Sequence, residues 1–177
     1  VARVSRSWRL VYQPLTRRWR LSQSNDAAAN NSGAGLQYAL HQNFDSLAAA
    51  LASAINDWQI AEWLEPEPRL RASINVAYED GELAAKEIHR LGDDPRFVQI
   101  LMLIRTAEPM GRRKYWPMYR AAAEHGLPVG VHYGGWGRGP LTGAGFPSYY
   151  LEDQVGMATA FQDQLTSLVF EGVFQEF

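Results

Sequence analysis

The sequence feature that most limits the possible folds is an almost unbroken apolar run at residues 97–104, FVQILMLI, which has the length of one β-strand. A strand needs such a run when it is buried on both faces, as strands are in parallel sheets covered by helices. Residues 128–132 form a second, shorter apolar run, and within residues 70–78 Ile74 and Val76 alternate with smaller or polar residues. These segments predict strands of one parallel sheet.

Segments with helical periodicity lie between and around these strands. The expected helices cover residues 45–63, 82–91, 112–125 and most of 151–177. The first is expected to begin at Asp45 or Ser46 and to stop before Pro66, and Gly92 and Gly126 close the next two. Strand and helix thus alternate with about 30 residues per unit, as right-handed βα units require.

This alternation predicts an α/β protein, and both a doubly wound sheet and a TIM (β/α)8 barrel satisfy it. A dinucleotide-binding sheet carries a glycine-rich turn that opens a helix. The glycines that follow residue 132, in YGGWGRGP, lead instead into a long loop. The sequence therefore supplies no nucleotide-binding fingerprint.

Composition excludes several classes of site. The chain has 177 residues and no cysteine, which excludes disulfides, thiolate zinc sites, iron–sulfur clusters and cysteine nucleophiles. A net charge of −2 gives no overall electrostatic reason to bind nucleic acid or an anionic membrane. No apolar run approaches the roughly 20 residues that cross a bilayer. We expect a cytoplasmic protein with no nucleic-acid or membrane partner.

The start of the chain differs from the rest. Residues 1–21 hold six arginines and no acidic residue, interleaved with Trp8, Tyr12 and Trp19, and a polar tract rich in Ser, Asn and Ala follows. Such a tract offers little apolar surface to offset the entropy of ordering it. We expect residues 1–34 to be an atypical, disordered N-terminal segment and residues 35–177 to be the folded domain. Binding of nucleic acid by residues 1–21 is a weaker alternative.

Two residues are candidates for chemistry because they end expected strands. The carboxyl edge of a parallel sheet is where α/β proteins collect ligands and catalytic groups. His132 ends one strand there, and its imidazole could bind a divalent metal ion or simply be satisfied by a backbone carbonyl. Arg105 follows the strongest strand, where its guanidinium could hold a substrate carboxylate or be an exposed charge.

The other histidines are weaker candidates. His89 and His125 lie near the C-terminal ends of expected helices, where an imidazole gains from the helix dipole. His41 precedes the first clear periodic segment. No second histidine stands two or four residues from any of them, so a local two-histidine metal motif is absent.

The order of several short stretches resembles amidohydrolase-related proteins of the aminocarboxymuconate-semialdehyde decarboxylase type. The stretches are NDW at residues 56–58, EWL at 62–64, PRLRASI at 68–74, FVQ at 97–99, YWPMY at 115–119, AAA at 121–123, GLPV at 126–129, VHYG at 131–134, FPSYY at 146–150 and SLVFEGVF at 167–174. The likeness runs from about residue 35 to residue 177.

This resemblance implies a TIM barrel with one divalent metal ion, often zinc, and hydrolysis or non-oxidative decarboxylation of small carboxylated compounds. Residues 70–78, 97–104 and 129–132 would be barrel strands three, four and five. His132 would match the metal-binding histidine at the end of strand five.

The sequence also departs from the family pattern. The family opens with a His-x-His pair, whereas this sequence has no histidine before His41, and it is expected to end before the family's sixth strand and the late aspartate that completes the metal site. A barrel takes about 250 residues and catalytic zinc usually has three protein ligands. We therefore expect part of a barrel, about strands 3 to 5 with flanking helices, that is inactive as this fragment.

Two functions from different classes stay open. The first is a segment of a metal-dependent hydrolase or decarboxylase, in which Arg105 orients a carboxylate. The second is a non-catalytic α/β scaffold or interaction protein whose open barrel edges are covered by a partner chain, with the basic, aromatic start of the chain as the docking arm. Self-association through the open edges would favour this second function.

Overall fold

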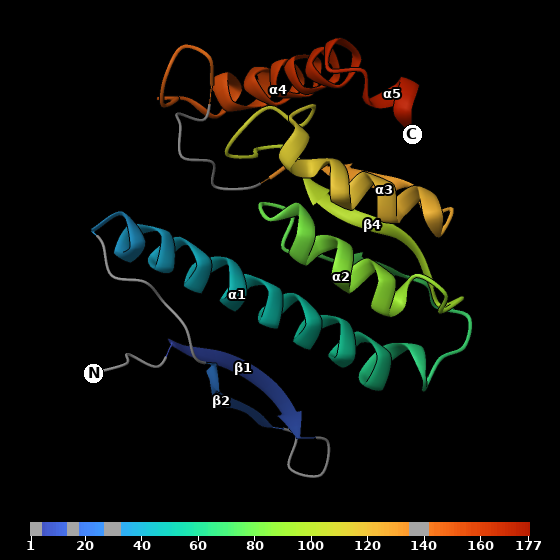
Figure 1. The fold of residues 1–177 in the computed structure, drawn as a ribbon. Helices are drawn as coiled ribbons and strands as arrows, with labels where there is room; N and C mark the ends of the chain where they lie inside the picture. Colours follow the sequence, from blue (N-terminus) through green and yellow to red (C-terminus); the bar gives the residue numbers. More distant parts are fainter. Residues whose placement is uncertain (1–4, 14–17, 27–32, 135–141) are drawn as a thin grey trace.

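The computed structural model of the chain describes residues 5–13, 18–26, 33–134 and 142–177, with side chains from residue 46 onward in these ranges. Figure 1 shows the order of the elements. They are β1 (Ser5–Gln13), β2 (Arg18–Asp26), α1 (Gly33–Gln59), the π-helix η1 (Ile60–Leu64), β3 (Ala72–Asn75), α2 (Gly81–Leu91), β4 (Phe97–Leu103), the 3-10 helix η2 (Arg113–Tyr115), α3 (Trp116–Glu124), β5 (Val129–His132), α4 (Tyr150–Phe170) and α5 (Val173–Glu176).

The centre of the fold is a three-stranded parallel sheet with the strand order β3-β4-β5. Helices α2 and α3 connect its strands, and successive strands along the chain are neighbours in the sheet. An open parallel sheet with flanking helices is the arrangement of part of a TIM barrel. The predicted fold class, α/β with about three barrel strands, is therefore confirmed.

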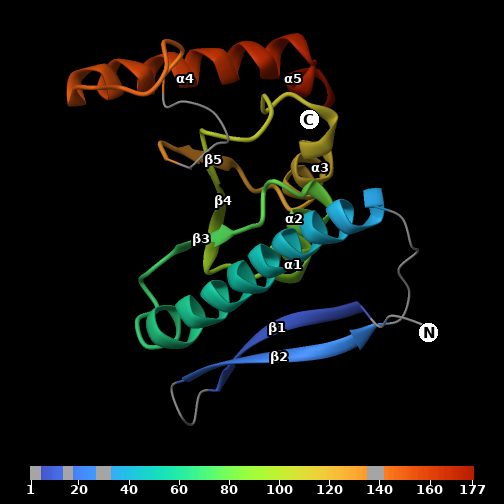
Figure 2. The same cartoon turned by 90° about the vertical axis from the view of Figure 1, so that its left-hand side faces the viewer.

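One face of this sheet carries the hydrophobic core. Ile74, Ile100 and Met102 are buried there against Ile88 of α2 and Met118 of α3. Full burial of one such side chain contributes about 1.5–3 kcal/mol. Figure 2 shows α2 and α3 together on one side of β3, β4 and β5.

Side chains alternate between the two faces of a strand, so the other face is built from the residues in between. It includes Ser73 and Gln99, whose side chains share a hydrogen bond of 2.8 Å, and Leu103, which pairs with His132 in the register. These residues are only partly buried or exposed. The second face of the sheet therefore lacks the helix cover of the first.

Helix α2 begins and ends where the sequence predicts, for two different physical reasons. At its start the Asp80 carboxylate accepts hydrogen bonds from the backbone N–H groups of Glu82 and Leu83, both at 3.0 Å. At its end Gly92 has φ −63°, in the right-handed region. The glycine there is required by close packing, because a Cβ atom would lie 2.4 Å from the His125 ring.

Helix α1 differs from the sequence prediction at its start. It begins at Gly33 and runs through Asp45 and Ser46 without a break, and with η1 the helical segment ends at Leu64, before Pro66 as expected. Residues 35–44 contain neither proline nor an internal glycine after Gly35, so nothing in the sequence stops the helix from extending toward the N-terminus.

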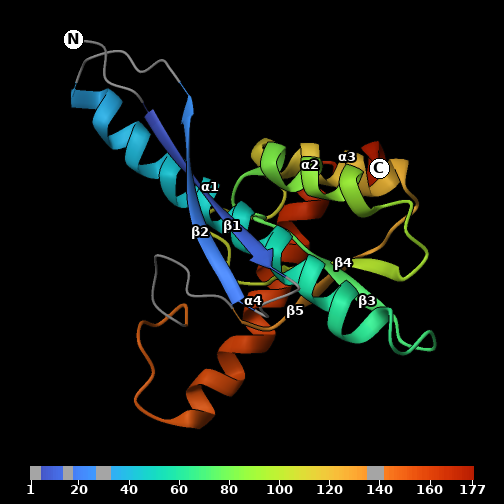
Figure 3. The same ribbon diagram turned by 90° about the horizontal axis from the view of Figure 1, so that it is seen from below.

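Strands β1 and β2 form an antiparallel pair in a sheet of their own, within the segment for which the sequence predicts no regular structure. Trp8, Leu10 and Tyr12 alternate with other residues as a strand requires, and Leu10 pairs with Leu21. Figure 3 shows the pair crossing close to α1, which it contacts through β1. The division into residues 1–34 and 35–177 stays a prediction, and α1 runs across that boundary.

A buried amide joins α1 to the free edge of β3. Asn56 is fully buried, donates to Asn75 O at 2.9 Å and accepts from Asn75 N at 2.9 Å, so it pairs with the strand as a neighbouring strand would. Its amide also donates to the buried carboxylate of Glu87 at 2.8 Å. Glu87 in turn accepts from Ser53 at 2.7 Å and from Arg90 at 2.6 Å, so this buried charge is paired.

Within the described ranges, none of the helices combines the length and apolar character that crossing a membrane requires.

Candidate active site at the carboxyl edge of the sheet

The two predicted site residues lie at neighbouring strand ends. His132 is the last residue of β5, and Ile104 N donates to its backbone oxygen at 2.9 Å. Arg105 follows β4, and its N–H donates to Gly134 O at 3.1 Å. The structure therefore brings Arg105 and His132 to one edge of the sheet.

Arg105 already binds a carboxylate. Its guanidinium donates to Asp153 Oδ1 at 3.0 Å and to the hydroxyl of Tyr133, and it lies 4.7 Å from the centroid of the Tyr133 ring. The Arg105 side chain is only 13% exposed and that of Asp153 22% exposed, so the pair is partly shielded from water. The alternative reading of Arg105 as an exposed strand-end charge is therefore wrong.

Tyr133 connects to the same carboxylate and stays protonated. Its hydroxyl donates to Asp153 Oδ1 at 2.9 Å. Desolvation, followed by the bond to Asp153, raises the pKa of Tyr133 above its usual range. The hydrogen bonds from Tyr133 and then from Arg105 lower the pKa of Asp153. At neutral pH the group is therefore one carboxylate held by one cation and one neutral hydroxyl.

A second polar group surrounds Glu79, which follows β3 on the same edge. Its carboxylate accepts from Ala107 N at 2.7 Å, from Lys114 Nζ at 3.0 Å and from the buried hydroxyl of Tyr115 at 3.2 Å. Partial burial acts to lower the pKa of Lys114, but the hydrogen bond and the charge of Glu79, together with Tyr115, outweigh it and the pKa is raised. Desolvation raises the pKa of Tyr115. These groups are paired with one another and tie the ends of β3 and β4 together.

At the carboxyl edge the described residues do not assemble a metal centre with three protein ligands. The His132 ring is exposed, and its Nδ1 lies 2.5 Å from the backbone oxygen of Tyr133. Among residues 46–134 and 142–177, no three histidine, aspartate or glutamate side chains lie close enough together to hold a metal ion. Catalytic zinc usually needs three protein ligands, so these residues do not fit the metal that the family resemblance implies.

Comparison with protein families gives a clear result at this point. The family model described as amidohydrolase matches residues 25–177. The chain belongs to the amidohydrolase family. No curated protein matches it. The predicted hydrolase-type family is thus confirmed, and the finer resemblance to the aminocarboxymuconate-semialdehyde decarboxylase type stays a prediction.

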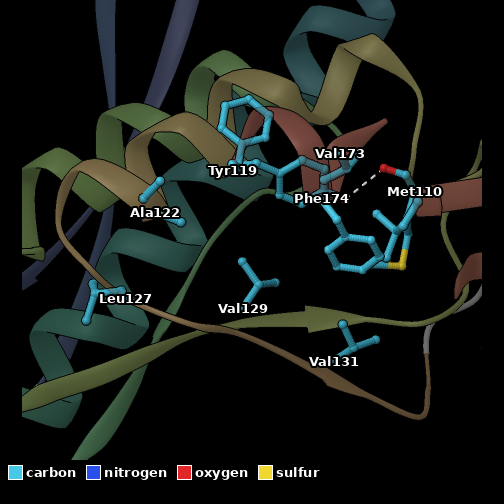
Figure 4. Close-up of a pocket in the computed structure, with 11 residues that line it drawn as sticks. Met110, Tyr119, Ala122, Leu127, Val129, Val131, Val173 and Phe174 are labelled. Atoms are coloured by element: carbon cyan, nitrogen blue, oxygen red, sulfur yellow. Dashed lines mark hydrogen bonds between the residues drawn. The ribbon is translucent and has the colours of Figure 1, made fainter. Parts of the chain in front are cut away.

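An apolar cavity of this amidohydrolase lies between the sheet and the last helices. It has a volume of about 300 Å³ and is bounded by α3, β5, α4 and α5. Figure 4 shows Val129, Leu127, Ala122 and Phe174 around it, with the Tyr119 hydroxyl bonded to Met110 O at 2.8 Å. Among the described residues that line it, Tyr119 alone is ionisable, and burial raises the pKa of that hydroxyl. This cavity offers apolar packing and no acid–base group for an amidohydrolase reaction.

Sequence reasoning missed two acidic residues at the carboxyl edge, Glu79 and Asp153. Glu79 could have been found by the argument that found Arg105, because it too follows a strand. Asp153 could not, because it stands in the first turn of α4, far along the chain from β4. Lys114, which sequence reasoning did not single out, is paired with Glu79.

Proposed function

We propose that this amidohydrolase chain forms part of the site of a hydrolase or non-oxidative decarboxylase that acts on small carboxylated compounds. The observation that carries the proposal is the carboxylate of Asp153 held by Arg105 beside the strand end of His132. A guanidinium paired in this way has the geometry and shielding to bind a carboxylate from a ligand. In this proposal the substrate carboxylate takes the place of Asp153.

The protonated Tyr133 would then serve as a second donor to the substrate. Its hydroxyl already bonds to the same oxygen of Asp153 as Arg105 does. Together the two side chains would hold one carboxylate oxygen from two directions and so fix the orientation of the substrate. The described residues do not favour hydrolysis over decarboxylation, since both reactions use such a carboxylate anchor.

Benzoate binding tests the anchor with two variants of opposite expected effect. Arg105→Gln removes the cation and is expected to weaken benzoate binding at least tenfold, as loss of a charge-assisted bond of about 1.5–3 kcal/mol predicts. Asp153→Asn removes the competing carboxylate and is expected to tighten it several-fold. Binding is followed by NMR titration of the full chain. Equal affinities in the wild type and both variants would contradict the proposal.

We further propose that His132 is one metal ligand of the family site, with the remaining ligands supplied from outside the described residues. A single exposed imidazole holds a metal ion poorly, so His132→Ala is expected to leave Zn²⁺ uptake by the purified chain unchanged. Equilibrium dialysis followed by elemental analysis measures this. Stoichiometric zinc that is lost in His132→Ala alone would contradict this expectation and would show that other residues of this chain complete a metal site around His132. We also propose that this chain by itself does not catalyse the reaction and that it is located in the cytoplasm.

A second candidate function is a scaffold that associates with a second copy. It is favoured by the outer edge of β5, which pairs with no other strand in the described part of the chain. The large apolar side chains exposed on α4 also favour it: Leu151, Val155, Leu165, Val169 and Phe170. Dimers in sedimentation velocity, together with unchanged benzoate affinity in Arg105→Gln, would support this function over the first.

A further inference from the structure

Two histidine rings from different helices face each other at the end of the sheet opposite to the carboxyl edge. His89 stands in the last turn of α2, and His125 follows the last residue of α3. Helices that connect parallel strands run back across the sheet, so their C-terminal ends lie near the amino ends of the strands. His89 Nδ1 and His125 Nε2 are 3.1 Å apart, and the ring centroids are 5.3 Å apart.

Each ring also has a carboxylate on its far side. His125 Nδ1 lies 2.8 Å from Asp93 Oδ1, and His89 Nε2 lies 3.9 Å from Glu124 Oε2. An ionised carboxylate only accepts hydrogen bonds, so Asp93 favours the tautomer of His125 that carries its proton on Nδ1. The lone pair of His125 Nε2 then points toward His89.

The position of the His125 ring is fixed by its packing. Its side chain is 14% exposed, whereas that of His89 is 50% exposed. The ring lies against Gly92, where a Cβ atom would be 2.4 Å from the ring carbon Cγ. The His125 ring is therefore held in place, whereas the more exposed His89 ring has room to rotate.

We propose that His89 and His125 form a surface binding site for a divalent transition-metal ion of the zinc class. His89 Nδ1 and His125 Nε2 are the two protein ligands, and water completes the coordination. Tetrahedral zinc with Zn–N bonds of about 2.0–2.1 Å holds two nitrogens about 3.3 Å apart. The observed separation of 3.1 Å needs to change by only a few tenths of an ångström, together with a tilt of the rings that points both lone pairs at the metal.

Metal binding replaces the hydrogen bond between the two rings without releasing a proton. In the metal-free pair His89 Nδ1–H donates to His125 Nε2. When the metal takes both lone pairs, the His89 proton moves to its Nε2, beside Glu124. Both rings then have a carboxylate near the nitrogen that does not bind metal, which is the arrangement that orients metal-bound histidines in proteins.

This site differs from the proposed family site in residues and in position. Imidazole ligands suit Zn²⁺, Ni²⁺ and Cu²⁺ and do not suit Mg²⁺, which prefers oxygen. With only two protein ligands the affinity is lower than that of a structural zinc site. A bound ion links the end of α2 to the end of α3 and is therefore expected to stabilise the fold by mass action.

Calorimetric titration of the full chain with Zn²⁺ tests the site. The wild type is expected to bind one ion at this site and to melt at a higher temperature when Zn²⁺ is added, whereas Mg²⁺ has no such effect. His89→Gln and His125→Gln are expected to weaken binding at least tenfold and to abolish the thermal shift. His89 is half exposed, so its substitution leaves the fold intact, which circular dichroism verifies.

His132→Ala is the matched control, because it removes a histidine at the other end of the sheet. It is expected to bind Zn²⁺ as the wild type does. Wild-type affinity in both His89→Gln and His125→Gln would overturn the proposal, and so would binding that only His132→Ala removes. Because the benzoate titration does not involve these residues, the outcome here is independent of the proposed function.

Discussion

Replacing Asn56 with aspartate is expected to lower the free energy of unfolding by about 3–5 kcal/mol at pH 7, the magnitude for an uncompensated buried charge. The Asn56→Asp side chain keeps the shape but has no N–H to donate. Asn75 O and Glu87 Oε1, which accept from Asn56 at 2.9 and 2.8 Å, lose their donor. The new carboxylate also faces that of Glu87 in a buried place.

The effect of Asn56→Asp is expected to depend on pH. Burial and the like charge of Glu87 raise the pKa of the new carboxyl group in the folded state above its unfolded value of about 3.9. The penalty from ionising this group is therefore absent at pH values below the unfolded pKa, and stability is lost as the pH rises through the folded pKa. Urea unfolding at pH 4 and pH 7 is therefore expected to show a smaller penalty at pH 4.

Ser53→Ala is the matched control for this experiment. It removes one hydrogen bond to Glu87, the 2.7 Å bond from the Ser53 hydroxyl, and adds no charge. A loss of about 1 kcal/mol is expected, with little dependence on pH. If Asn56→Asp were no worse than Ser53→Ala at pH 7, Asn56 would not be the residue that joins α1 to the edge of β3.

Gly81→Ala is expected to destabilise the fold by about 2–3 kcal/mol, although alanine is the better helix former by about 1 kcal/mol. Gly81 is the first residue of α2, and a Cβ atom there would lie 2.1 Å from the backbone oxygen of Lys114 and 3.2 Å from Pro117 Cδ. Neither neighbour is the end of a flexible side chain, so α2 and α3 would have to move apart. Thermal and urea unfolding measure the change.

The sign of the change in stability caused by Gly81→Ala shows whether close packing or helix propensity dominates at this position. Gly143→Ala serves as the control, because nothing lies within 4 Å of a Cβ atom at that position. It is expected to change stability by no more than about 0.5 kcal/mol. Stabilisation by Gly81→Ala would mean that the close approach of α2 to the segment before α3 is not a constraint of the fold.

The strands and helices of the sheet could be predicted from the sequence because each depends on its own pattern. The apolar run at residues 97–104 became β4, and the alternation of Ile74 and Val76 indicated β3. The observed β3 covers only residues 72–75 of the predicted 70–78, and its pairing with β4 shifts register between Ala72 and Ser73. The exact ends and register of a strand depend on its tertiary contacts, and these leave no periodic signal in the sequence.

The candidate site could be predicted only in part. The position of Arg105 at a strand end predicted a place on the carboxyl edge, and the structure puts it there. Its partner Asp153 reaches that edge because α4 passes back over it, which depends on the path of the loop between β5 and α4. In the same way, His89 and His125 were separate helix-end histidines in the sequence, and only the packing of α2 against α3 brings their rings together.

The two outer edges of the sheet, at β3 and at β5, differ in whether a strand from a second molecule could pair with them. At β3 the backbone groups of Asn75 are occupied by Asn56, and Gln59 lies 3.4 Å from Ser73 O, so an incoming strand meets side-chain amides in place of free donors and acceptors. At β5 no such amides stand in the way in the described ranges. Strand addition at β5 alone joins two molecules and then stops, whereas two open edges would permit a growing fibril. The amide of Asn56 therefore closes this part of the β3 edge to strand addition.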